Sequence, residues 1–368
     1  MDEKSCQTDD RKSRMKKLWI KNTAEDKIAM LQQAESVHTG INQSAIEKDW
    51  WVTVTLFALS KCSCVPYLTF KGGTSLSKGF NLIDRFSEDI DLAIHHSFFG
   101  VESTTKSQKE KLRKASRAYV HNTLSKQLDD ALRKMGVTGY RIENVTYIQT
   151  QDGTSKLIDS DKDPTVIHLL YDSVVQDVIT YIPPRVKIEV SCLSMDEPTE
   201  ERNIHSLISE VFSEEDEIGI GFRTVLPTRT FLEKIFLLAE EFQKDNPRCL
   251  RMCRHLYDLE RLMDSTYGLE ALGNRQLYDT IVEHRRTYYA LKYVDYNQHD
   301  PRFIKIIPPQ SVIQDWSEDY ANMQEHFLGY YPHLSDGNRQ VQRNDNGVGR
   351  HLQRYAVLGS GNPQRVDR

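Results

Sequence analysis

The sequence lacks the long apolar runs and the cysteine density that mark membrane and secreted proteins. None of its hydrophobic segments reaches the roughly 18 residues that a membrane-spanning helix needs, and residues 1–17 have no apolar centre of a signal peptide. Its six cysteines are too few and too irregularly spaced for a disulfide framework in 368 residues. We therefore expect a cytoplasmic protein with free thiols and no membrane partner.

The sequence also lacks a strong net charge and an internal repeat. Its net charge of −5 at pH 7 argues against a surface built throughout for nucleic acid. Basic residues nevertheless gather in three stretches, around 11–21, 248–254 and 339–354. Such patches can attract a phosphate backbone, although any single patch is also typical of a solvated surface. Charge alone leaves both interpretations open.

Composition and periodicity divide the chain into four segments. With 39% hydrophobic residues, the chain can build cores for two domains. The pattern predicts a polar helical leader or docking arm in residues 1–50 and mixed helices and strands in residues 51–200. It predicts mainly helices in residues 201–334 and a loosely ordered tail in residues 335–368. The expected fold class is α/β, with a mixed sheet and a C-terminal, mainly helical domain.

The second segment contains several runs that are typical of strands, and one long helix. The helix is expected over residues 106–135 and ends near Gly136, while residues 50–61 fit either a buried helix or a strand. The predicted strands lie within residues 67–70, 85–94, 140–150, 165–175 and 185–193.

The strand-like run RFSEDIDLAI places two carboxylates on one face. Alternation along a strand points Asp89 and Asp91 to the same side and the apolar residues between them to the other. Like charges at that range repel unless water, donors or a divalent cation compensates them. Carboxylates on a rigid strand suit Mg²⁺ or Mn²⁺, although a solvated acidic edge strand explains the same pattern.

The segment KGGTSLSKGF, just upstream, predicts a phosphate-binding turn. Gly72 and Gly73 follow a short strand and allow the backbone to approach a ligand closely. Thr74 or Ser75 then lies where a helix begins and offers a hydroxyl and free N–H groups to an anion. The segment does not fit a Walker A motif. A phosphate cradle followed by a carboxylate pair favours phosphoryl or nucleotidyl transfer from a nucleoside triphosphate.

A third carboxylate is available in the strand-like run RVKIEVSC. Alternation places Lys187, Glu189 and Ser191 on one face of this strand, with apolar residues on the other. Glu189 is therefore a candidate to lie beside the aspartate pair. An exposed strand face that carries a lysine and a glutamate accounts for the pattern equally well.

Together, GGTSLSKGF and RFSEDIDL resemble the signature of the nucleotidyltransferase superfamily, and specifically of the AbiEii/AbiGii (type IV toxin, MenT-like) family. The resemblance covers about residues 60–270. The family pattern continues with a lysine on a later helix and an aspartate on the next one. Those positions are filled here by Lys234 in TFLEKIFLLAEE and Asp258 in RHLYDLERL.

The two helical positions also have an interpretation from the residues themselves. Thr230 and Glu233 have capping-box spacing, which predicts a helix that begins at Thr230. Lys234 lies at the edge of the apolar surface of that helix, where it either reaches a triphosphate or extends its stem over the core. On the next helix Arg254 and Asp258 share a face, so we expect Arg254 to hold Asp258.

The resemblance implies a nucleotidyltransferase palm and a helical domain that completes the cleft. It implies that a substrate hydroxyl attacks the α-phosphate of a nucleoside triphosphate. The implied acceptor is RNA, with tRNA 3′ ends modified by some relatives, and the implied role is that of a phage-defence toxin countered by a cognate antitoxin. The catalytic residues that the resemblance implies are Asp89, Asp91, Lys234 and Asp258, to which strand alternation adds Glu189 as the third carboxylate. We expect Mg²⁺ or Mn²⁺ on Asp89, Asp91 and Glu189, and nucleotide phosphates on Gly72, Gly73, Thr74, Ser75 and Lys234.

Two other classes remain open on the sequence. A small-molecule nucleotidyltransferase, of the kind that modifies aminoglycosides, would have the same carboxylates but an acidic acceptor pocket. A binding module with a degenerate site is the non-enzyme alternative, which the intact aspartates and glycines disfavour. A zinc site at Cys249, Cys253 and His255 is disfavoured, because no second ligand pair follows.

Ser87 is a candidate control point. Strand alternation places it on the same face as Asp89 and Asp91, where a phosphoryl group would add about two negative charges at neutral pH. Such a group would compete with a triphosphate, so phosphorylation by an antitoxin is one hypothesis. The alternative is a serine that only bonds the neighbouring backbone.

Overall fold

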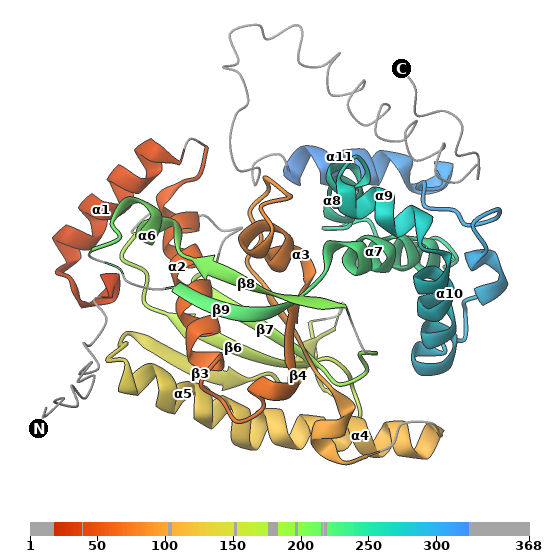
Figure 1. Ribbon diagram of the computed structural model, residues 1–368, viewed down its shortest axis with the longest axis horizontal. Coiled ribbons are helices and arrows are strands. Elements are labelled where there is room, and N and C mark those ends of the chain that lie inside the picture. The colour runs from red at the N-terminus through yellow and green to blue at the C-terminus, as the bar shows by residue number, and fades with distance from the viewer. Residues whose placement is uncertain are drawn as a thin grey trace, which may run out of the picture.

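The computed structural model is built around one mixed sheet (Figure 1). It describes residues 18–323 except residues 39, 102–104, 151–152, 176–182, 196–197, 215 and 217–218. The predicted tail at 335–368, the end of the predicted helical segment at 324–334 and the first 17 residues of the predicted leader lie outside the described residues.

Seven strands form the sheet in the order β3-β6-β7-β2-β1-β9-β8. The pairs β2–β7 and β1–β9 are parallel and the other neighbours are antiparallel, so the predicted mixed α/β sheet is confirmed. A separate hairpin, β4–β5, joins Tyr147–Gln149 to Ser155–Leu157. The strands of the main sheet are β1 (Leu68–Lys71), β2 (Ile90–Ile94), β3 (Tyr140–Asn144), β6 (Thr165–Tyr171), β7 (Arg185–Ser191), β8 (Thr199–His205) and β9 (Gly219–Val225).

The last two strands were not expected, because residues after 200 were predicted to be mainly helical. β8 reads TEERNIH and lies at the sheet edge with one partner, so its polar residues face solvent and give little strand signal. β9 contains two glycines and an arginine, yet it pairs with β1. The sheet therefore extends to Val225, and the predicted boundary at residue 200 is too early.

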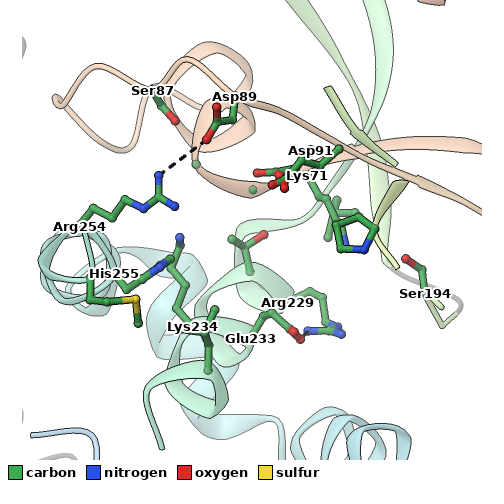
Figure 2. Close-up of a pocket in the computed structure, with 18 of the residues that line it drawn as sticks. Lys71, Ser87, Asp89, Asp91, Ser194, Arg229, Glu233, Lys234, Arg254 and His255 are labelled. Atoms are coloured by element: carbon green, nitrogen blue, oxygen red, sulfur yellow. Dashed lines mark hydrogen bonds and ion pairs between the residues drawn. The ribbon is translucent and has the colours of Figure 1, made fainter. Parts of the chain in front are cut away.

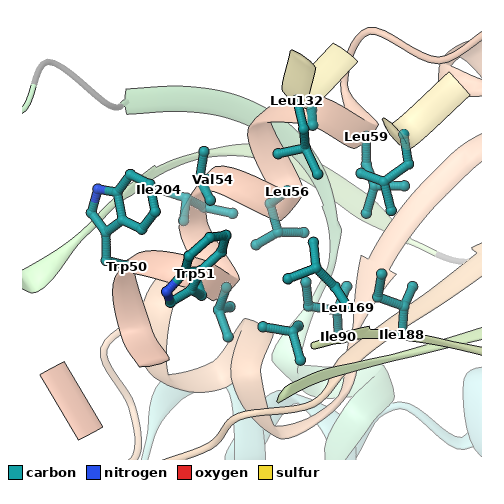
Figure 3. Close-up of a cluster of buried hydrophobic side chains, with 14 of the residues drawn as sticks. Trp50, Trp51, Val54, Leu56, Leu59, Ile90, Leu132, Leu169, Ile188 and Ile204 are labelled. Carbon is teal, nitrogen blue, oxygen red and sulfur yellow. The ribbon is translucent and has the colours of Figure 1, made fainter. Parts of the chain in front are cut away.

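Helices α1 (Ala24–Val37), α2 (Gln43–Leu59) and α5 (Ser125–Lys134) pack with the sheet around one hydrophobic core (Figure 3). Trp51 of α2 is fully buried and stacks on Tyr171 of β6 at 4.8 Å between ring centroids. Leu31 of α1 belongs to the same core. Residues 18–50 are therefore an integral part of the first domain, and their prediction as a leader is wrong.

The predicted long helix is confirmed as one rod in three parts. α4 (Lys106–Tyr119) continues through a π-helical segment (Val120–Leu124) into α5. Gly136 follows the rod with a φ of +75°, a conformation that favours glycine and ends a helix.

A second hydrophobic core unites the C-terminal helices and confirms the predicted helical region. It also takes in Leu76 and Ile83 from the segment between β1 and β2, so the two parts of the chain share this core. α7 begins at Pro227 with Leu226 as its N-cap, so the predicted capping box at Thr230 and Glu233 is wrong. The helices are α7 (Pro227–Glu241), α8 (Cys253–Met263), α9 (Thr266–Gly273), α10 (Arg275–His284) and α11 (Ile313–Met323).

In the described part of the chain, no helix combines the length and the apolar character that crossing a membrane requires.

The packing of α1 predicts a matched pair of stability changes. Leu31 is 0% exposed, and Val37 of the same helix is 58% exposed. We expect Leu31→Ala to lower the free energy of unfolding by about 2 to 5 kcal/mol, because it leaves a cavity in the core. Val37→Ala should change it by less than about 0.5 kcal/mol. Chemical denaturation measures both, and an unchanged midpoint for Leu31→Ala would mean that α1 is a dispensable arm.

Candidate active site

The turn after β1 brings the backbone close to side chains of the site, and the predicted approach of its two glycines to a phosphate stays a prediction. Gly72 has a φ of +82°, and a Cβ atom there would lie 1.9 Å from Oδ2 of Asp91. A Cβ atom on Gly73 would lie 2.7 Å from Nη2 of Arg85 and 2.8 Å from Oγ of Ser87. Both positions therefore exclude a side chain, because functional groups of the site occupy that space.

The two hydroxyls that follow have a different role from the one expected. Thr74 is fully buried, and its Oγ1 donates to the carbonyl oxygen of Asp89 and lies 3.0 Å from Oγ of Ser87. Ser75 is also fully buried and donates to the carbonyl oxygen of Gly72. The Thr74 hydroxyl therefore ties the turn to the residue before β2, the Ser75 hydroxyl closes the turn itself, and neither residue lines the cavity described below.

The register of the sheet places the predicted third carboxylate beside the aspartates. β2 and β7 pair in parallel with Asp91 opposite Glu189, and β1 pairs with β2 so that Lys71 is opposite Asp91 on the other side. Burial, the Glu189 carboxylate and the Asp89 carboxylate together raise the pKa of Asp91 to about 7. Lys187 forms an ion pair with Glu189 at 2.8 Å and offsets part of this negative charge.

Asp89 lies just before β2 rather than within it. Its carboxylate forms an ion pair with Arg254 of α8 at 3.8 Å, as Figure 2 shows. Among the residues that the structure describes, no three Asp, Glu, His or Cys side chains converge closely enough to hold a metal in this conformation. The Asp89 carboxylate is paired with Arg254, and this pairing contributes to the separation of the carboxylates.

A buried ionic cluster joins the sheet domain to the helical region. Asp258 is fully buried, and its carboxylate accepts bonds from Nε and Nη2 of Arg85 at 2.6 and 2.7 Å. Lys234 of α7 lies 2.8 Å from the same carboxylate. Although burial opposes it, the charges of Arg85 and Lys234 hold the pKa of Asp258 well below its usual range. Arg254 binds Asp89 instead, so the expectation that Arg254 holds Asp258 is wrong.

These residues surround a cavity of about 550 Å³ between the sheet and the helices. One wall is a face of α7, with side chains at the helical spacing 229, 230, 233, 234 and 237. Arg248 and Arg254 of the predicted basic stretch also line it. The lining carries seven cationic residues against four carboxylates. The cations are Lys71, Arg85, Lys187, Arg229, Lys234, Arg248 and Arg254, and the carboxylates are Asp89, Asp91, Glu189 and Glu233.

The predicted residues divide between the cavity and its support. Gly72, Gly73, Asp89, Asp91, Glu189 and Lys234 line the cavity, whereas Thr74, Ser75 and Asp258 lie behind it. Ser87 lines it although it precedes the strand, and its Oγ lies 3.0 Å from Oγ1 of Thr74. Cys253 is buried in the second core, as a structural cysteine should be.

Sequence reasoning missed several lining residues. Lys71 ends β1 on the same face as Thr69, and no motif in the sequence marks it. Arg85 is the first residue of RFSEDIDLAI, and the sequence gives no sign of its partner, Asp258. Arg229 and Glu233 form an ion pair one helical turn apart, and Arg285 binds Glu233 as well. Only the fold shows that this pair faces the carboxylates.

Comparisons with known proteins identify the family of the chain. The family model described as nucleotidyl transferase AbiEii toxin, type IV TA system, matches residues 54–344. A comparison with curated proteins finds no match.

Two solved structures share an approximate likeness with the chain. MenT4, a nucleotidyltransferase toxin from Mycobacterium tuberculosis, is 15% identical, and the match covers 92% of this chain and 99% of that one with a TM-score of 0.39. JHP933 from Helicobacter pylori is also 15% identical, with 83% of this chain and 97% of that one covered and a TM-score of 0.33. Since the matched family model spans most of the sequence, the chain belongs to the AbiEii family of nucleotidyltransferase toxins.

Proposed function

We propose that the protein transfers a nucleotide from a nucleoside triphosphate to a hydroxyl at the 3′ end of an RNA, with tRNA as the expected acceptor. The acceptor oxygen attacks the α-phosphorus, the bond from that phosphorus to the bridging oxygen breaks, and pyrophosphate leaves. The observation that carries the proposal is the cavity itself, in which Asp89, Asp91 and Glu189 face a wall of cations. This separation of charge suits a reaction that moves polyphosphate.

The triphosphate is proposed to lie between the glycine turn and the helices. Gly72 and Gly73 line the cavity without side chains of their own, close to the side chains of Asp91 and Ser87. Lys234 and Arg254 line the same part of the cavity and would neutralise the charge of the β- and γ-phosphates. Arg254 would exchange its ion pair with Asp89 for one with phosphate, which frees the Asp89 carboxylate.

Carboxylate oxygens are the ligands that Mg²⁺ and Mn²⁺ prefer, and we propose that Asp89, Asp91 and Glu189 would hold such a cation once Asp89 leaves its ion pair with Arg254. The pKa of Asp91 is raised by burial and by its carboxylate neighbours, which is the signature of negative charge that a cation would compensate. When bound, such a cation neutralises charge on the phosphate and brings the reacting oxygens together. Glu189 lies opposite Asp91 on the neighbouring strand and is proposed to accept the proton of the attacking hydroxyl.

The excess of cations in the cavity favours an RNA acceptor over an aminoglycoside. An aminoglycoside is itself cationic, so its pocket should be acidic, whereas here seven cations line the cavity against four carboxylates. The presence of all three carboxylates together with both glycines disfavours a degenerate binding module.

Family membership supports a toxin role, and with it a cognate antitoxin as partner. A function in phage defence stays a prediction. We place the reaction in the cytoplasm, because the described cysteines are free thiols. Phosphorylation of Ser87 remains a prediction, and its support is that Ser87 lines the cavity beside Gly73.

The first test of this function is transfer itself. The wild-type protein, incubated with each labelled nucleoside triphosphate, Mg²⁺ and total RNA, should label RNA of one size class. Asp91→Asn should abolish labelling, while the metal-free variant becomes more stable by about 1 to 3 kcal/mol because a repulsive charge is removed. Asp279→Asn, at an exposed ion pair with Arg275, is the control and should change neither the labelling of RNA nor the stability of the protein. Full labelling by Asp91→Asn would refute the assigned site.

Lys234 is expected to act on the nucleotide. Lys234→Met keeps the stem in place but removes the charge, so transfer should fall by about 100-fold or more and nucleotide binding should weaken. Asp258 retains its two bonds from Arg85, so we expect the free energy of unfolding to fall by only about 1 to 3 kcal/mol. Lys244→Met, which removes an ion pair with Glu241 outside the cavity, is the control and should leave transfer and nucleotide binding unchanged. Calorimetric titration with a non-hydrolysable triphosphate would contradict a phosphate role if affinity were unchanged.

Asp258 is expected to position other residues rather than to touch the substrate. Asp258→Asn keeps the shape but leaves Arg85 and Lys234 buried without their counter-charge, so stability should fall by about 3 to 5 kcal/mol. Adding Lys234→Met should restore part of this loss, because one uncompensated cation is then removed. Asp84→Asn, at the exposed pair with Arg261, should cost less than about 1 kcal/mol. Loss of transfer by Asp258→Asn at unchanged stability would instead support a direct catalytic role.

A further inference from the structure

Helix α4 concentrates positive charge in a chain that is acidic overall. Within Lys106–Tyr119 there are six lysines and arginines against one glutamate, whereas the whole chain has a net charge of −5. The proposed reaction uses none of these residues, and the basic stretches noted in the sequence lie elsewhere.

Five of the six cations lie on one side of the helix. Leu112 and Ser116 are buried against the protein, and helical spacing places the cations along the flank of this buried face. Lys111 lies on the opposite flank and is exposed. We call the five cations on this side, Lys106, Lys109, Arg113, Lys114 and Arg117, the stripe. At 1.5 Å per residue, the stripe spans about 16 Å, a length that covers several phosphates of a nucleic acid helix.

Carboxylates near the stripe offset only part of its charge. Glu110 forms an ion pair with Lys114 at 2.6 Å, and Asp161 also acts on Lys114. Asp163 and Arg113 both act on the thiol of Cys192, so the Asp163 carboxylate also lies near the stripe. Burial and the charge of Arg113 lower the pKa of Lys109, so neighbouring cations in the stripe act on each other.

The stripe is joined to the wall of the catalytic cavity. The Nζ atom of Lys109 donates to the carbonyl oxygen of Thr287 and lies 4.7 Å from the ring centroid of Tyr288. Tyr288 stacks on His284, which lines the cavity. On the other side of α4, Leu112 packs with Leu193, two residues beyond the end of β7. Figure 1 shows the N-terminal end of α4 on the same side of the molecule as α10.

The cavity has two ends, and α4 adjoins the one away from the proposed triphosphate. In Figure 2, Ser87, Asp89 and Arg254 lie on one side of Asp91, and Ser194 lies on the other. His284 and Tyr289 also line the cavity, and the adjacent Tyr288 contacts Lys109. An acceptor must reach Asp91 from the side opposite to the leaving pyrophosphate, because the displacement is in line.

We propose that the cationic stripe of α4 binds the phosphodiester backbone of the acceptor RNA and guides its 3′ end into the cavity past Ser194 and His284. This inference rests on the proposed function. Phosphate contacts of this kind supply affinity and orientation without reading sequence, so the stripe would hold the body of the acceptor while the cavity handles its end.

The composition of the stripe favours RNA over a protein partner. Protein interfaces depend on apolar and aromatic anchors at their centre. None of the large exposed hydrophobic residues of the described chain lies on α4. A surface that offers cations without anchors is suited to phosphates, whose binding depends on charge.

The test compares two double variants that remove the same charge. Lys106→Gln/Arg117→Gln removes two cations of the stripe, and Lys111→Gln/Lys305→Gln removes two exposed cations outside it. Titration of purified tRNA at 50 to 200 mM salt should give about 10-fold weaker binding for the stripe variant and a salt slope that is shallower by about 1.8. The control variant should stay within twofold of wild type. Equal weakening by both variants would overturn the proposal, since it would then reflect net charge alone.

A second readout separates this inference from the proposed function. With a trinucleotide acceptor too short to reach α4, the stripe variant should keep wild-type kcat/KM, while kcat/KM for full-length tRNA falls about 10-fold. An equal loss on both acceptors would overturn the proposal. If the wild-type protein transferred to no acceptor, the proposed function would fail, and the binding titration would still decide the role of the stripe. If the double variant did not fold, Lys106→Gln, at the exposed first residue of α4, would replace it.

Unchanged tRNA binding by the stripe variant, with loss of binding to a co-produced antitoxin, would assign the surface to a protein and overturn the RNA proposal.

Discussion

The carboxylate of Asp258 holds the two halves of the molecule together. Arg85 comes from the segment before β2, Lys234 from α7 and Asp258 from α8, and all three side chains are buried. Two cations and one anion removed from water are tolerated only when their bonds are made together. The helical region must therefore seat on the sheet domain in one way. That seating creates the cavity, because one wall is the sheet and the other is the face of α7 next to Lys234.

A second constraint is the register between two parallel strands. Pairing of β2 with β7 sets Asp91 opposite Glu189, and a shift by one residue would turn Glu189 to the apolar side of the sheet. The apolar faces of both strands belong to the first core, so burial of Ile90 and Ile188 fixes this register. The energy of the core thus places like charges side by side, and the cost appears as the raised pKa of Asp91. Stability elsewhere in the fold holds a locally unfavourable arrangement that binding of a cation would relieve.

Local patterns predicted the carboxylates well because they depend only on alternation. Asp91 and Glu189 came from period-two spacing, and the glycine pair came from the need for backbone close to a ligand. The hydroxyls of Thr74 and Ser75 were predicted to bind phosphate, but they donate to backbone carbonyl oxygens. A hydroxyl at a turn can bond either a ligand or the nearby backbone, and the sequence does not distinguish the two. The partner of Asp258 was wrong for a related reason. Helical spacing suggested Arg254, but the tertiary fold supplied Arg85 from 173 positions away.

The overall charge of the chain also misleads unless its distribution is known. A net charge of −5 suggests a poor partner for phosphate, yet cations outnumber carboxylates in the cavity and in α4. Attraction between exposed charges is screened within about 8 Å at physiological salt, so a phosphate responds to the groups nearest to it and not to the total. Acidic residues elsewhere can keep the protein from binding polyanions indiscriminately, while the local cations admit them at one place. An excess of negative charge outside the cavity is therefore compatible with the proposed polyphosphate chemistry inside it.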